Sequence, residues 1–312
     1  MSFRFLPAFQ ATYKSVWVLL LLLAVLIVSN SAYSQQSDEH SIDFIKILQY
    51  AKLAESTYQT ESVIRKQAYS KNYSLTHYGF IPGIGIAYFL ITDDLAKKQI
   101  LAVRGTSNIE NAFVDVALKL TVDKYTGIPL HNGFSQAAQA IYAEIKSQLK
   151  TDYVIDTTGH SLGGAVAVIL AMYMDVDKYK VGSVITFGQP KVTNVFGAGK
   201  FQYLDMTRVV TPRDLVPLVP FLDPVDINDI DIYWHLGREI VLQEGNVYSV
   251  LQGSGSMMRA TKFTQEPLSE KNLVNHQMTL YLKMLETKIS NAKQVPFKHS
   301  LNLFNLFGGD EK

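Results

Sequence analysis

The segment Gly159–Gly164 reads GHSLGG and contains a G-x-S-x-G pattern centred on Ser161. Such a serine sits on a sharp strand-to-helix turn, where its neighbours two residues away on each side must be small. The turn lifts the hydroxyl above the edge of a sheet, and the amides that open the following helix point at the reacting carbonyl. A β-prone run over 153–158 and an apolar stretch over 165–174 flank the pattern. Together they predict that Ser161 is a nucleophile for acyl transfer.

A serine hydroxyl is a weak nucleophile at neutral pH and needs a base that an acid holds in place. After this kind of turn the chain order is serine, then aspartate or glutamate, then histidine. Asp214 is the strongest acid candidate because it follows a predicted strand over 208–210, at the sheet end where such sites form. Asp205 precedes that strand. Four aspartates of a polar loop are interpreted as solvated: Asp223, Asp226, Asp229 and Asp231.

Three histidines follow this acid: His235, His276 and His299. His276 comes after a long irregular stretch and opens an apolar-periodic helix, which is where a hydrolase of this chain order presents its base. His235 leads straight into a strand-like run and is interpreted as a packed hydrogen-bond partner. His299 lies in a tail that the pattern does not place, and His160, before the acid, is interpreted as a structural residue.

The oxyanion of a tetrahedral intermediate needs two amide donors. One is the N–H of the residue after the nucleophile, Leu162, and the other comes from a loop after an earlier strand. Thr106 fits the second role, because a strand-like run ends at Val103, Gly105 permits a sharp turn, and Thr106 offers both an amide and a hydroxyl.

The elements that must position these residues alternate between strand-like and helix-like patterns. Helical spacing covers residues 42–54, and a second helical pattern runs from 137 to 149. Strand-like runs cover 85–92, 99–103, 153–158, 184–187 and 208–210, and a late hairpin pairs 240–242 with 247–251. The alternation predicts an α/β fold with a mostly parallel central sheet and helices on both faces.

Composition narrows the classes of protein that remain. The 312 residues are 47% apolar and 18% charged, which is typical of one large packed domain. The net charge is +1 without a basic run, so a nucleic-acid partner is not expected. The chain has no cysteine, which excludes a disulfide framework, a thiol nucleophile and a cysteine-ligated metal.

The N-terminus has the pattern of a secretory signal peptide. Arg4 and Lys14 precede an apolar run over 16–28, and small or polar residues follow up to Ser34. The run is shorter than the ~20 apolar residues of a membrane span, although a retained anchor or a buried helix is the alternative. We therefore expect a signal peptide over 1–34, a catalytic domain over 35–290, a tail over 291–312, and export to the extracellular medium or the periplasm.

Several ordered motifs together resemble the class 3 lipases, the family of the filamentous-fungal triacylglycerol lipases. The matching segments are Tyr50–Ala54, Val103–Thr106, His131–Phe134, Gly159–Gly164, Thr186–Val192, Asp214–Pro217, His235–Glu239 and Asn275–His276. The resemblance covers about residues 50 to 285 and implies an α/β-hydrolase fold. It also implies a triad of Ser161, Asp214 and His276, an oxyanion hole at Thr106 and Leu162, and no metal or organic cofactor. The fungal members are typically disulfide-bonded, and this chain departs from them in having no cysteine.

The resemblance further implies a helical lid, and the sequence supports one independently. Ile109, Phe113 and Val116 fall at helical spacing between Thr106 and His131, so an amphipathic helix could cover an apolar cleft and swing out at a lipid–water interface. An ordinary core-facing helix is the alternative.

The implied activity is hydrolysis of water-insoluble acylglycerols through an acyl-enzyme. A phospholipase A1 or a soluble-ester (feruloyl-type) esterase would share the same motifs. A non-catalytic binding protein on the same fold is a further alternative, because fold alone does not give function.

Overall fold

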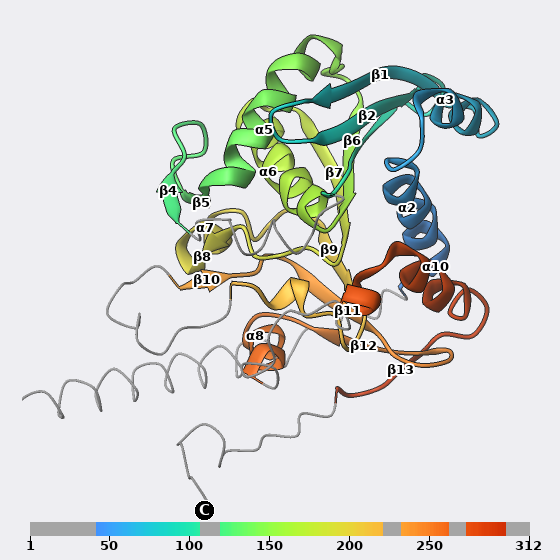
Figure 1. Cartoon of the computed structure of the whole chain (residues 1–312), viewed down its shortest axis with the longest axis vertical. Helices are drawn as coiled ribbons and strands as arrows, with labels where there is room; N and C mark the ends of the chain where they lie inside the picture. The colour runs from blue at the N-terminus through green and yellow to red at the C-terminus, as the bar shows by residue number, and fades with distance from the viewer. Residues whose placement is uncertain (1–41, 107–118, 221–231, 262–272, 298–312) are drawn as a thin grey trace, which may run out of the picture. The chain divides into compact units, whose positions relative to one another are not determined.

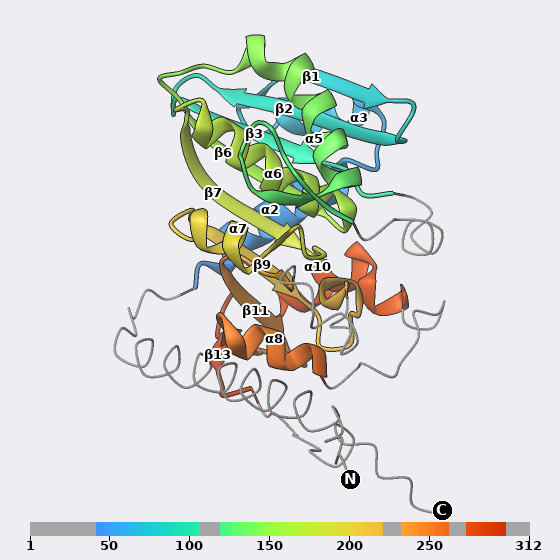
Figure 2. The same ribbon diagram turned by 90° about the vertical axis from the view of Figure 1, so that its left-hand side faces the viewer.

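The protein contains a nine-stranded mixed β-sheet. The computed structural model describes residues 42–106, 119–220, 232–261 and 273–297. The strand order is β1-β2-β3-β6-β7-β9-β11-β12-β13. The strands from β1 to β11 can be followed in this order in Figure 2. Their bounds are Ser74–Ile81, Ile86–Asp93, Lys98–Val103, Val154–His160, Lys180–Phe187, Met206–Val210, Arg238–Leu242, Val247–Leu251 and Lys293–Gln294.

The middle of this sheet is parallel, from β3 through β6, β7 and β9 to β11. The edges turn back as hairpins, because β1–β2, β2–β3 and β11–β12 are antiparallel. The short β13 pairs with β12 in parallel and lies at the start of the segment expected as a tail. The prediction of a mostly parallel sheet is confirmed, and so is the late antiparallel hairpin.

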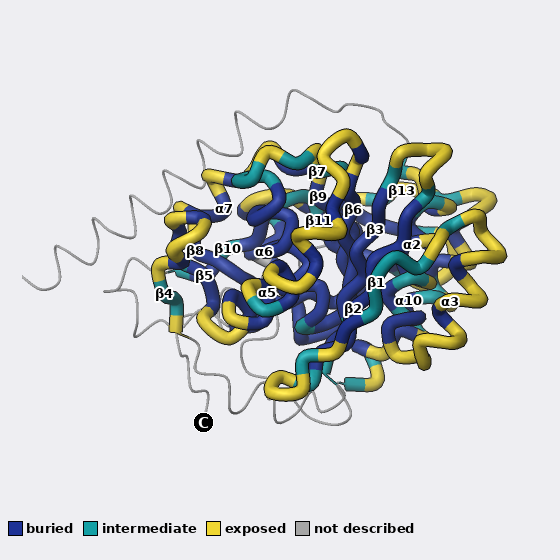
Figure 3. Tube along the Cα trace, turned by 90° about the horizontal axis from the view of Figure 1, so that it is seen from above, coloured by how far each residue is buried: buried dark blue, intermediate teal, exposed yellow. Residues whose placement is uncertain are grey.

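Helices cover both faces of the sheet, as the sequence predicts. Figures 1 and 3 show α5 (Asn132–Ile145) and α6 (Leu162–Val176) on one face, and α2 (Phe44–Ser56) and α10 (Met278–Glu286) on the other. The helix α3 (Glu61–Tyr69) packs beside β1. The pattern expected to run to residue 149 ends as an α-helix at Ile145 and continues as a 3-10 turn over Lys146–Gln148.

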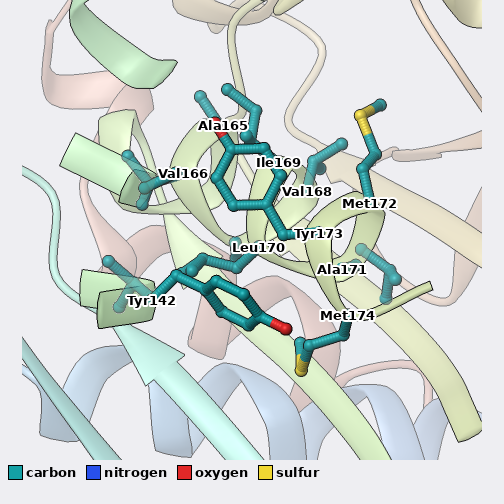
Figure 4. Close-up of a cluster of buried hydrophobic side chains, with 14 of the residues drawn as sticks. Tyr142, Ala165, Val166, Val168, Ile169, Leu170, Ala171, Met172, Tyr173 and Met174 are labelled. Carbon is teal, nitrogen blue, oxygen red and sulfur yellow. The ribbon is translucent and has the colours of Figure 1, made fainter. Parts of the chain in front are cut away.

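The helix that follows Ser161 is the centre of the hydrophobic core. Every residue of α6 from Gly163 to Met174 is buried, which is expected for a helix that is apolar on all sides. Its side chains interleave with Tyr142 of α5 (Figure 4). This packing fixes the helix rigidly, and therefore also the serine at its N-terminus.

A second, four-stranded sheet was not predicted. Its order is β10-β8-β5-β4, with bounds Tyr233–Trp234, Thr193–Asn194, Pro129–His131 and Leu120–Val122. Strands of two or three residues are too short to produce a recognisable alternation. Within the described ranges, the remaining helical elements are α7 (Val195–Lys200), α8 (Ser254–Thr261) and two 3-10 turns, η2 (Val216–Leu218) and η4 (Val274–His276).

Several sequence-based expectations lie outside the described residues. They are the signal peptide over 1–34, the lid residues Ile109, Phe113 and Val116, the loop aspartates Asp223, Asp226, Asp229 and Asp231, and His299. From Asp43 onward the described residues belong to one compact unit.

Among the described helices, none is both long and apolar enough to cross a membrane.

Candidate active site

Ser161 occupies a strained turn between β6 and α6. Its φ of 58° and ψ of −133° lie in a region that residues with a side chain rarely adopt. Both flanking glycines are required by close packing. A Cβ on Gly159 would lie 2.4 Å from the Gly163 carbonyl oxygen, and one on Gly163 would lie 2.3 Å from the Val103 carbonyl oxygen. The G-x-S-x-G spacing therefore follows from how tightly this turn packs against itself and against the end of β3.

Asp214 and His276 lie together although 62 residues separate them. His276 Nδ1 is 2.7 Å from Asp214 Oδ2, and both side chains are fully buried. Asp214 follows β9, and its other oxygen accepts the backbone N–H of Val216 at 2.9 Å. Because a carboxylate only accepts, Nδ1 carries the proton, which leaves Nε2 of a neutral ring as a proton acceptor.

Tyr281 of α10 is a second donor to the same carboxylate oxygen. Its hydroxyl lies 2.5 Å from Asp214 Oδ2, and the ring is fully buried. Burial, and then the nearby Asp214 charge, raise the pKa of Tyr281 well above its usual value. The hydroxyl therefore stays protonated and donates a hydrogen bond from α10 to the Asp214 carboxylate. No role was predicted for this tyrosine from the sequence.

Two buried polar atoms at this site have no hydrogen-bond partner among the described residues: Ser161 Oγ and His276 Nε2. Leaving a buried polar group unpaired costs about 1–3 kcal/mol, so most proteins avoid it. Here the unpaired atoms are a hydroxyl that can lose a proton and a ring nitrogen that can accept one. The arrangement is chemically suited to general-base activation of the serine.

The expected oxyanion residues flank the serine. Leu162 is the first residue of α6, where a backbone N–H has no partner within its own helix. Thr106 ends the described loop after β3. A Cβ on its neighbour Gly105 would lie 3.0 Å from Ser161 Cβ, so this loop contacts the nucleophile turn directly. Both positions can present a backbone N–H to an oxygen bound beside Ser161.

His160 contacts the base from the residue just before the nucleophile. Its Nε2 is 2.7 Å from the His276 carbonyl oxygen, and its Nδ1 is 2.9 Å from the Tyr58 hydroxyl. Its ring faces the His276 ring at a centroid distance of 4.5 Å. The sequence suggested a structural hydrogen-bonder at His160 but gave no sign that its partner is the base, nor any role for Tyr58.

His235 lies apart from the Asp214–His276 pair. Its Nε2 is 2.6 Å from the carbonyl oxygen of Pro217, and burial lowers its pKa well below the usual value. It is therefore a neutral, packed hydrogen-bond donor beneath the loop that follows Asp214, in agreement with the interpretation from the sequence.

Gly188 is a further residue of the site that sequence reasoning missed. It directly follows β7 with a φ of +60°, and a Cβ there would lie 2.6 Å from His276 Cε1 and 2.9 Å from Asp214 Oδ2. Any side chain at position 188 would displace His276 and Asp214. The available signal was a glycine at the carboxyl end of a strand, in the segment TFGQPKV.

Among the described residues, no group of three or more His, Asp or Glu side chains is placed to hold a metal ion.

Comparison with known proteins shows which family part of this chain resembles. Residues 100–223, which include Ser161 and Asp214, match the family model of the class 3 lipases. A secreted mono- and diacylglycerol lipase 1 of Fusarium solani is 36% identical over 121 residues, which cover 36% of each chain. A lipase of Rhizopus niveus is 30% identical over 148 residues, covering 42% of this chain and 37% of the relative. The chain thus matches little more than a third of the length of these curated relatives.

Solved structures share the fold over a larger part of the chain. A lipase from Rhizopus microsporus var. chinensis superposes with a TM-score of 0.55 at 25% identity, covering 64% of this chain and 75% of that one. Lipase II from Rhizopus niveus has a TM-score of 0.61 at 22% identity and covers 75% and 92%. The fold is that of the α/β hydrolases, and residues 100–223 are similar to the class 3 lipases.

Proposed function

We propose that this protein is a serine carboxylic-ester hydrolase that acts on acylglycerols. The observation that supports it most is the buried Asp214–His276 pair together with the strained Ser161, because His276 Nε2 and Ser161 Oγ both lack a hydrogen-bond partner among the described residues. Fold alone would not carry this proposal, because related folds host unrelated functions.

In the proposed reaction, His276 Nε2 takes the proton of Ser161 as Oγ attacks the ester carbonyl. The backbone N–H groups of Thr106 and Leu162 stabilise the oxyanion. His276 then protonates the leaving alcohol, and an acyl-serine remains. Water attacks this ester in the same way, which releases the fatty acid and restores the serine. Asp214 keeps the ring in the required tautomer and stabilises the imidazolium.

Acylglycerol as the substrate class rests on the relatives and on the sequence. The relative from Fusarium solani is named for mono- and diacylglycerols. The apolar spacing of Ile109, Phe113 and Val116 suits a lid over an apolar cleft, and we propose this role although these residues lie outside the described part of the chain. The signal-peptide pattern over 1–34 supports export, with a mature chain that begins near Gln35 and continues as the hydrolase domain.

The test is a hydrolysis screen with purified mature protein on emulsified triolein, a diacylglycerol, a phosphatidylcholine and a soluble p-nitrophenyl ester. We expect turnover of the acylglycerols, and a loss of about 10⁶-fold in kcat in Ser161→Ala. Turnover of phosphatidylcholine alone, or of the soluble ester alone, would contradict the proposed substrate class. Equal activity of a folded Ser161→Ala protein would contradict the proposed chemistry.

The lid is tested separately with Phe113→Ser. If Phe113 contacts lipid, the variant loses more activity on the triolein emulsion than on the soluble ester. Equal losses on the two substrates would instead favour a helix that packs into the core.

A further inference from the structure

His160 lies between the turn that contains Ser161 and the proposed base, His276. It precedes Ser161 in the chain, its Nε2 lies 2.7 Å from the backbone carbonyl oxygen of His276, and its ring faces the His276 ring. We propose that His160 is a positioning residue that fixes the backbone and ring of His276, so that His276 stays on Asp214 while presenting Nε2 to the serine. This inference rests on the proposed function, because it assigns the base of that reaction.

The hydrogen bonds determine which ring nitrogen of His160 carries the proton. A carbonyl oxygen only accepts, so Nε2 must donate to His276, and Nδ1 must then accept. The donor to Nδ1 is Tyr58, whose hydroxyl is 2.9 Å away. An ordinary tyrosine has a pKa of about 10, so the phenol keeps its proton at neutral pH. Burial lowers the pKa of His160 well below its usual value, so its ring is neutral. Tyr58 therefore selects the tautomer that His276 needs.

The turn that carries the base is held at two successive carbonyls. The Thr211 hydroxyl donates to the Asn275 carbonyl oxygen at 2.8 Å, and His160 donates to the next one, at His276. Thr211 lies three residues before Asp214, and His160 lies one residue before Ser161. Each anchor thus ties the base to the chain segment of another member of the proposed triad, which keeps their relative positions fixed.

The same network reaches the oxyanion loop. A Cβ on Gly105 would lie 2.8 Å from the Tyr58 hydroxyl oxygen and 2.8 Å from the His160 carbonyl oxygen, so both residues lie against this loop. A displacement of about 1 Å at a reacting group can cost about 10²-fold in rate. Loss of the His160 side chain is therefore expected to lower kcat while leaving substrate binding largely intact.

The experiment compares His160→Leu, His160→Gln and Tyr58→Phe in the mature protein. The structural readout is the downfield proton NMR signal of His276 Nδ1–H, assigned by its absence in His276→Gln, and it needs no ester turnover. The kinetic readout is kcat and KM on a soluble ester. The matched control is His235→Leu, because His235 is also a buried histidine whose Nε2 donates to a carbonyl, that of Pro217.

We expect His160→Leu to broaden or shift the His276 signal and to lower kcat about 10²-fold with KM little changed. His160→Gln keeps an N–H donor, so it retains part of the His276 signal and part of kcat. Tyr58→Phe changes the signal and lowers kcat in the same way but by less. His235→Leu lowers Tm but leaves the signal in place. If His160→Leu is too unstable to purify, Tyr58→Phe alone decides the matter, because it removes only one hydroxyl.

An unchanged His276 signal and kcat in His160→Leu, or in Tyr58→Phe if the former does not fold, would overturn the positioning role and leave the proposed function standing. A signal that depends on His160 in a protein without esterase activity would support the positioning role and contradict the proposed function. A signal lost equally in His235→Leu would show a general loss of packing, and would also overturn the assignment.

Discussion

Ser161 combines a backbone conformation that costs energy with a buried hydroxyl that has no partner among the described residues. Positive φ at a non-glycine residue costs of the order of 1–3 kcal/mol and persists only where the surrounding structure holds it in place. Gly159 and Gly163 provide that surrounding structure, because they allow the turn to close on itself. On the other side of the site, Asp214 Oδ2 accepts from both His276 and Tyr281. Strain and charge are thus both held in place by fully buried neighbours.

At the residue scale, Tyr281→Phe tests the second donor to Asp214. A hydrogen bond to a charged group contributes about 1.5 kcal/mol or more, so its loss is expected to lower kcat about tenfold, with KM unchanged. The measurement is steady-state kinetics on a soluble ester with Tm as a check on folding. Tyr142→Phe is the matched control, because Tyr142 also donates to a carboxylate, Asp177 at 2.7 Å, away from the site. Equal kcat in Tyr281→Phe and wild type would show that the Tyr281 hydroxyl does not contribute to turnover.

At the scale of elements, Asp123 joins the turn between β4 and β5 to α5 and α6. Its oxygens accept from the Thr126 backbone N–H at 2.8 Å, from the Ser135 hydroxyl at 2.8 Å and from the Tyr173 hydroxyl at 2.8 Å. Burial raises the pKa of Asp123, but the hydrogen bonds from Thr126, Tyr173 and Ser135 lower it by more, so the net shift is downward. One carboxylate thus ties the small sheet to the core helix that carries Ser161.

Asp123→Ala is expected to lower the free energy of unfolding by about 3 kcal/mol, because it leaves several buried donors unpaired. Since the folded-state pKa is depressed, the ionised carboxylate stabilises the fold above its unfolded pKa, and this contribution is lost as the pH falls below about 4. Urea denaturation at pH 7 and at pH 3 measures both effects. A difference between wild type and variant that is the same at both pH values would contradict the role of the ionised form.

Element patterns were predictable where they are long, and contacts between distant residues were not. Long apolar runs predict the parallel strands and α6. The motif around Ser161 and the order of residues along the chain predict Ser161, Asp214 and His276 as site residues. The burial of β1 does not alternate, and the strands of the second sheet are too short to show a period, so both were missed. The hydrogen bonds that Tyr58, His160 and Tyr281 make within the site were missed, because a hydrogen bond between residues far apart in the chain leaves no local pattern.

At the scale of the whole molecule, the interior holds a cluster of buried charges. Glu239 accepts from Arg208 at 3.1 Å and lies 2.5 Å from Arg259, and Lys191 donates to the Leu218 carbonyl and to the Pro220 carbonyl at 2.6 Å. Burial, followed by the charges of Arg208 and Arg259, lowers the pKa of Lys191 to about 7. The fold therefore favours the neutral amine of this lysine.

This shift predicts an unusual pH dependence of stability. Between about pH 7 and 10.5 the unfolded chain keeps the Lys191 proton and the folded chain does not, so unfolding takes up a proton and stability rises with pH. The slope from this residue approaches about 1.4 kcal/mol per pH unit. Urea denaturation of wild type and Lys191→Met between pH 7 and 9.5 is expected to show a shallower slope in the variant. Parallel curves would place the lysine's titration outside this range.

We propose that Ser161 is the nucleophile and that His276, not His235, activates it. The most direct measurement is labelling with an organophosphonate, followed by peptide mass spectrometry of the wild type and of Ser161→Ala, His276→Gln and His235→Gln, each checked for folding. We expect one adduct per chain on Ser161 in the wild type and in His235→Gln, no adduct in Ser161→Ala, and almost none in His276→Gln. An adduct on another residue, or labelling lost in His235→Gln and kept in His276→Gln, would contradict this proposal.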